Sequence, residues 1–235
     1  MKTKRVNLIA PLAGLLATCA LISAASAQTV YGIDSGVTSL TLHKAALDTL
    51  GFTIVGTSDT TTASVGYDTG LSISTTTAAA EKFTFTADPD FTPGPGLIEH
   101  TGTLLLGTAL APAGAVTLGN FDISFDSERM TAANSGFFLT DGADFDSQIL
   151  FDIGTPVSNV FNGSEWHFVD SNLFVSPEFA TFLGNPALTG QDFGDLRIDA
   201  LTSITKKGGG DKVPEPSTVL LACFGGFALF FRRRR

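Results

Sequence analysis

The chain of 235 residues carries 14 lysine and arginine residues against 23 aspartate and glutamate residues, a formal net charge of −9. Only seven of the basic residues lie between positions 28 and 231, together with all 23 acidic ones, so this part of the chain has a charge of −16. Such a surplus argues against nucleic acid or anionic lipid as a partner, because both require a basic surface.

The first 27 residues have the layout of a secretory signal peptide. Three basic residues within positions 2–5 precede an apolar run over 6–22, which is expected to form the signal helix. Ala25 and Ala27 are the small residues that signal peptidase recognises, which predicts cleavage before Gln28. The body of the chain is therefore expected to be exported.

The two cysteines lie close to the two ends of the chain. Cys19 ends the stretch LATC, which loosely resembles a lipoprotein box, although Thr18 is larger than the glycine, alanine or serine usual before the modified cysteine. Cys223 lies in the C-terminal apolar run. The exported body is thus predicted to have neither a disulfide nor a thiol nucleophile, and its stability must come from a hydrophobic core.

Residues 28–205 are predicted to form one mainly β domain. In the run FDISF (121–125), for example, apolar residues occupy every second position, as in a strand with one buried face. The predicted strands are 52–57, 82–87, 97–107, 115–127, 136–141, 148–154, 164–175 and 195–204. Many short strands separated by turn residues favour an antiparallel β-sandwich of the jelly-roll kind.

One or two short helices are expected within this domain. Ser176 provides a helix cap, Pro177 occupies the first helical position and Gly184 follows the last turn. A second helix is predicted over 44–50, ended by Gly51.

The aromatic and imidazole side chains do not form a recognisable catalytic motif. His43, His100 and His167 lack the spacing of metal-ligand pairs, and no serine lies in a G-x-S-x-G sequence. His100 and His167 are interpreted as residues of the surface or the rim of the fold. Trp166 is expected in the core, with stacking on a sugar ring as the alternative.

Acidic residues are concentrated in the stretch DGADFD, where Asp141, Asp144 and Asp146 occupy the first, fourth and sixth positions. Calcium prefers several such hard oxygen ligands on a loop, so these three residues are the candidate metal site and calcium is the one candidate cofactor. The alternatives are a solvated acidic loop and a pair of carboxylates that hydrolyses glycosides.

A flexible linker and an apolar tail end the chain. Residues 206–212 include three consecutive glycines and are predicted to form the linker. Residues 217–231 are predicted to form a transmembrane helix of about 22 Å, which is short for a bilayer core of about 30 Å. Four arginines follow it and are expected to stay on the cytoplasmic side; they are Arg232, Arg233, Arg234 and Arg235.

Residues 213–235 resemble the PEP-CTERM sorting signal in three parts and in the same order. Val213, Pro214, Glu215 and Pro216 form the motif, the apolar run follows it, and the arginine cluster comes last. The resemblance implies export to the inner membrane, processing near the motif by an exosortase-type enzyme, and delivery to the cell surface or the medium. It also implies a link to exopolysaccharide and biofilm.

A second, looser resemblance covers about thirty residues from Gly96, GLIEHTGTLLLG followed by AVTLGNFDISFD. These residues resemble HtaA-type haem-handling surface domains. That resemblance implies His100 as a haem contact and Tyr31 or Tyr67 as an iron ligand.

The sequence therefore favours a non-enzymatic protein of the cell envelope or extracellular matrix, with no catalytic residues. Its expected partners are signal peptidase, an exosortase-type enzyme, the inner membrane before processing, and exopolysaccharide. Two alternatives remain open: an extracellular binding module for carbohydrate or haem, and a carboxylate-dependent hydrolase.

Overall fold

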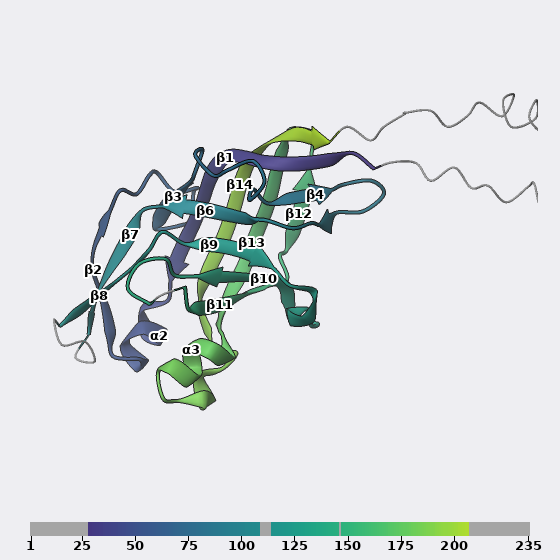
Figure 1. Ribbon diagram of the computed structural model, residues 1–235. Helices are drawn as coiled ribbons and strands as arrows, with labels where there is room; N and C mark the ends of the chain where they lie inside the picture. The colour runs from purple at the N-terminus through teal and green to yellow at the C-terminus, as the bar shows by residue number, and fades with distance from the viewer. Residues whose placement is uncertain (1–27, 109–113, 146, 207–235) are drawn as a thin grey trace, which may run out of the picture. The chain divides into compact units, whose positions relative to one another are not determined.

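Two long strands bring the ends of the body together. The computed structural model describes residues 28–108, 114–145 and 147–206. In it, β1 (Val30–Leu42) pairs antiparallel with β14 (Asp192–Lys206), from Val30 opposite Lys206 to Leu42 opposite Gly194. The first and last described residues therefore leave from the same end of the strands (Figure 1). β14 extends to Lys206, one residue into the predicted linker.

Eight antiparallel strands close into a barrel-like ring. Around the ring, β1 is followed by β3, β6, β9, β10, β11, β13 and β14, and β14 pairs again with β1. The bounds of the other six are β3 (Thr69–Ile73), β6 (Leu97–Thr101), β9 (Asp122–Phe125), β10 (Asn134–Thr140), β11 (Ile149–Gly154) and β13 (Glu165–Val175).

This closure corrects the predicted jelly-roll sandwich, although the mainly β class with two short helices is confirmed. A sandwich and a closed ring both bury every second residue of each strand, so alternation alone does not distinguish them. The deciding contact is the pairing of β14 with β1 on one side and with β13 on the other. The pairing of β1 with β14 joins residues between 152 (Leu42 and Gly194) and 176 (Val30 and Lys206) positions apart in the chain.

A second sheet of three strands lies beside the ring. It consists of β2 (Phe52–Ser58), β7 (Thr103–Thr108) and β8 (Ala115–Gly119), in the order β2-β7-β8. Two runs predicted as single strands are each divided between the sheets, 97–107 at Gly102 and 115–127 at Asn120, where φ is +112° and +46°. At Gly102 an added Cβ would lie 3.0 Å from the carbonyl oxygen of Asp59, so the bend depends on glycine.

Shorter elements complete the body. Three strands extend the ring sheet: β4 (Thr84–Thr86), β5 (Thr92–Pro93) and β12 (Ser158–Phe161). The helices are α2 (Lys44–Thr49) and α3 (Pro177–Phe182), with 3-10 turns at Ser127–Arg129 and Pro186–Leu188. The amide of Phe179 donates to the Ser176 hydroxyl at 2.9 Å, which confirms the predicted helix cap.

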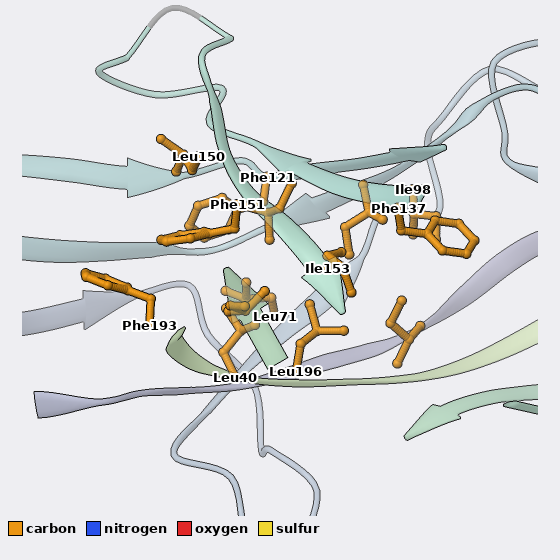
Figure 2. Close-up of a cluster of buried hydrophobic side chains, with 14 of the residues drawn as sticks. Leu40, Leu71, Ile98, Phe121, Phe137, Leu150, Phe151, Ile153, Phe193 and Leu196 are labelled. Carbon is orange, nitrogen blue, oxygen red and sulfur yellow. The ribbon is translucent and has the colours of Figure 1, made fainter. Parts of the chain in front are cut away.

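The core is apolar and rich in aromatic rings. Leucine, isoleucine and phenylalanine side chains from many strands meet inside the ring (Figure 2). Trp166 is fully buried, as expected, and its ring stacks on those of Phe83 and Phe91 at 6.0 and 5.3 Å. Its indole N–H donates to the side-chain oxygen of Asn159. Because the ring is fully buried, it cannot stack on a sugar at the surface, and that alternative is excluded.

The predicted ends of the chain fall outside the described part. The signal peptide with Ala25 and Ala27, the linker residues after Lys206, and the tail with its motif and arginines all lie there. Within residues 28–206, apart from the two short gaps, no helix is long and apolar enough to cross a membrane. The body itself, Thr29–Lys207, is one compact unit.

Candidate functional site

The acidic loop, residues 141–145, binds backbone amides. One carboxylate oxygen of Asp141 accepts a hydrogen bond from the amide of Gly119 at 2.7 Å. The other accepts from the amides of Ala143 and Phe145 at 3.1 and 2.9 Å. Asp141 is fully buried. Burial raises the pKa of its carboxyl group, and the three amides oppose that rise.

The same loop covers the outer edge of β8. Asp144 accepts from the amide of Thr117 at 2.6 Å, and the amide of Gly142 donates to the carbonyl oxygen of Gly119 at 3.0 Å. In a sheet, these outward-facing amides of β8 would donate to carbonyl groups of a neighbouring strand, and here they donate to carboxylates instead. The acidic loop therefore acts as a cap on the sheet edge.

This geometry gives the calcium hypothesis no support from Asp141 and Asp144. Both oxygens of Asp141 face N–H donors, which would repel a cation. Among the residues that the structure describes, no three acidic, histidine or cysteine side chains lie close enough together to hold a metal ion. Asp146, the third predicted ligand, lies outside the described residues.

A charged cluster on the outer face of β13 and β14 is centred on Asp199. Its carboxylate accepts hydrogen bonds from Arg197, from the Nδ1 of His167 at 2.7 Å, and from the hydroxyl of Ser64 at 2.7 Å. Burial alone would raise the pKa of Asp199, but these hydrogen bonds outweigh it and lower the pKa to about 2.

The Asp199 cluster contains the residue types of a hydrolytic triad but not its hydrogen bonds. In a triad the histidine accepts the proton of the serine hydroxyl and the acid orients the histidine. Here Ser64 and His167 both donate to Asp199. Among the described residues the Ser64 hydroxyl therefore donates to a carboxylate and not to an imidazole, which is not the hydrogen-bond chain of a triad.

His100 is buried, which corrects its predicted place at the surface or rim. Its Nδ1–H donates to the carbonyl oxygen of Phe121 at 2.9 Å, and its Nε2 accepts from the hydroxyl of Thr38 at 2.6 Å. Burial lowers the pKa of His100 to about 4, so the imidazole is neutral at physiological pH. The sequence contained a signal for this position, because His100 and the buried Ile98 share one face of β6.

The residues implied by the second resemblance do not converge on an open pocket. Both nitrogens of His100 have partners, as described above, and the Tyr67 hydroxyl donates to Asp170 at 2.8 Å. Burial and that hydrogen bond raise the pKa of Tyr67 to about 12, which disfavours the phenolate that would bind iron. Tyr31 packs its ring against Phe85 and Phe161.

A small apolar crevice lies between the second sheet, the ring and α3. Its volume is about 10 Å³, which is the space of a single water molecule. It is lined by Phe52, Leu106, Leu118, Phe145, Phe151, Phe179 and Phe193. A cavity of this size and lining holds neither a haem nor a sugar.

Two carboxyl groups stand opposite each other on the outer face of β6 and β9. Glu99 pairs with Asp122 in the strand register. The pKa of Asp122 is raised to about 6, mainly by burial and in second place by the negative charge of Glu99. The Thr77 hydroxyl donates to Glu99. In this pair an acid of raised pKa lies beside a second carboxyl group, and backbone amides do not occupy its carboxylate as they do that of Asp141.

Comparison with protein families places a known signal at the C-terminus. Residues 212–235 match the family model described as the PEP-CTERM protein-sorting motif. The chain carries a PEP-CTERM sorting tail. The PEP-CTERM match includes all four predicted motif residues and the arginine cluster, and it indicates an exported protein that an exosortase-type enzyme processes.

Other comparisons concern the body. No curated protein matches the chain. Among solved structures, the C-terminal domain of HtaA from Corynebacterium glutamicum is similar over 74% of this chain and 99% of that chain, with 12% sequence identity and a TM-score of 0.42.

Proposed function

We propose that this PEP-CTERM protein is a non-enzymatic component of the cell envelope or extracellular matrix, linked to exopolysaccharide and biofilm. The sorting motif at residues 212–235 is the observation that carries the proposal. It directs the protein to the envelope and gives no activity to the body.

The body supports a structural role in two ways. Its acidic loop and the Asp199 cluster use their polar groups to satisfy one another or the backbone. Its two ends leave side by side, because Val30 lies opposite Lys206. The chain therefore enters and leaves the body at the same end of the ring.

Cell fractionation tests the sorting step. The native chain, tagged in an exposed loop, is compared in cells with and without the exosortase gene. A variant with alanine at Pro214, Glu215 and Pro216 is compared with an Asp211→Ala control next to the motif. We expect the native chain and the control at the surface or in the medium, and the motif variant in the inner-membrane fraction. Equal release of all forms in both strains would refute the proposal.

A carboxylate-dependent hydrolase is the second candidate, favoured by the Glu99–Asp122 pair. Glycoside hydrolysis uses two carboxyl groups, one of which has a raised pKa, and the pKa of Asp122 is raised to about 6 beside Glu99. Polysaccharide turnover by the purified protein, lost in both Asp122→Asn and Glu99→Gln, would favour this candidate over the structural role. Absence of turnover across a panel of polysaccharides would remove it.

A further inference from the structure

The turn that joins β12 to β13 contains the pair Asn162 and Gly163, and no other asparagine of the chain is followed by glycine. Asparagine is among the chemically labile residues, and it is most so before glycine, which has no Cβ to hinder the backbone amide between them. Both residues and the following Ser164 are exposed, and an added Cβ at Gly163 would meet nothing within 4 Å. Solvent therefore reaches the peptide bond between the pair.

The backbone amide of Gly163 is available to react. Its three neighbours in the turn are occupied: the amide of Asn162 donates to the carbonyl oxygen of Glu165, and those of Ser164 and Glu165 donate to the side chain of Asn162. Among the described residues, no acceptor takes a hydrogen bond from the amide of Gly163. Its nitrogen is also held next to the side chain of Asn162 by the covalent chain itself, which removes the entropy cost of bringing the two together.

The side-chain carbonyl of Asn162 is polarised by its hydrogen bonds. Its Oδ1 accepts from the amides of Ser164 and Glu165 at 3.1 and 2.9 Å, and from the Ser164 hydroxyl at 3.4 Å. Attack on the adjacent Cγ places negative charge on this oxygen, and donors already aimed at it stabilise that charge, as in an oxyanion hole. These hydrogen bonds therefore strengthen during the reaction and do not have to break.

We propose that Asn162 is a site of self-modification, at which the side-chain amide is converted to a carboxylate. The nitrogen of Gly163 attacks Cγ of Asn162, so the N–Cγ bond forms and the Cγ–Nδ2 bond breaks. The departing NH₂ group takes up the proton that the Gly163 amide loses, and leaves as ammonia. Water then opens the succinimide at either carbonyl and gives aspartate or isoaspartate. The whole reaction consumes one water, releases one ammonia and does not depend on the sorting role.

The new carboxylate faces a carboxylate that is already there. The Nδ2 of Asn162 donates to Glu165 at 2.8 Å, so conversion replaces a hydrogen bond by a repulsion between like charges. Isoaspartate also adds one methylene group to the backbone of the turn. Both changes should loosen the nearby end of the β12–β13 pairing, where Phe161 lies opposite Trp166.

Peptide mapping by mass spectrometry tests the proposal, with the purified exported protein incubated at neutral pH over several weeks. The peptide that contains Asn162 should gain about 1 Da and separate by chromatography into two products of equal mass. Asn172 is the internal control, because its amide also donates to a carboxylate, that of Asp192, but leucine follows it. It should convert at least about tenfold more slowly.

Two comparisons make the result decisive. An Asn162→Gln variant keeps an amide at the same position on a longer side chain that does not form a succinimide, and its peptide should keep its mass. The native protein should convert Asn162 no more slowly than the same protein unfolded in urea, because the folded turn supplies the donors to Oδ1. A folded protein that keeps Asn162 intact while the unfolded chain converts it would overturn the inference, and so would an equal gain of mass in the Gln variant.

Discussion

Replacement of Asp141 by alanine should lower the free energy of unfolding by about 2–4 kcal/mol. The substitution leaves the amides of Gly119, Ala143 and Phe145 without their acceptor. A buried donor without a partner costs about 1–3 kcal/mol, and the amides nearer the surface can turn to water at lower cost. Part of this loss is offset, because the variant no longer buries a carboxylate whose charged form burial disfavours. For a body of this size the change corresponds to a fall of about 5–15 °C in melting temperature.

Thermal unfolding followed by circular dichroism measures this effect. Asp144→Ala is the matched control, because it removes one hydrogen bond, to Thr117, from an exposed position and should cost no more than about 1 kcal/mol. Scans in calcium and in chelator should coincide for the native protein. Two results would refute the reasoning: an Asp141→Ala protein that melts within a degree of the native one, or a native protein that chelator destabilises to the level of the variant.

Three further predictions concern ionisable groups. The imidazole signals of His100 should not shift in NMR spectra between pH 5 and 8, because its pKa is lowered to about 4; a titration in that window would contradict its burial. Asp122 has a pKa raised to about 6, so its contribution to stability is lost as pH rises from about 4 through 6. Asp122→Asn should therefore stabilise the protein by about 1 kcal/mol at pH 8 and not at pH 4, as measured by denaturant unfolding. Arg129→Met should destabilise the protein by about 2–4 kcal/mol in the same assay, because it leaves the carboxylates of Asp152 and Glu178 unpaired; an unchanged midpoint would show that the ion pairs contribute nothing.

The local patterns of the sequence predicted much of the fold. Alternation located most of the strands, and the cap at Ser176 and the stop at Gly51 located both helices. Ring closure was not predictable in this way, because it depends on contact between β1 and β14, at opposite ends of the body. The division at Gly102 was missed because the run 97–107 keeps its alternation while the backbone turns from one sheet to the other. At Asn120 the alternation changes phase, from Val116 and Leu118 to Phe121 and Ile123, and this signal was overlooked.

The sequence was less informative about what the polar residues do. The density of acids in DGADFD suggested a cation, but a carboxylate also accepts from backbone amides. The partners of Asp141 and Asp144 include Gly119 and Thr117, more than twenty positions away in the chain. Ser64 and His167 are likewise far from Asp199 in the chain, 135 and 32 positions away, and only the hydrogen bonds among the three distinguish an ion-pair cluster from a triad. The sorting tail was different, because its three parts are contiguous and need no tertiary contact to be recognised.

The most direct test of the account is the intact mass of the protein recovered from the outside of the cell. Export and sorting predict a chain that begins at Gln28 and ends near the motif at 213–216, so that both basic ends are missing. A full-length chain in the cytosol, with Met1 and Arg235 still attached, would contradict the account.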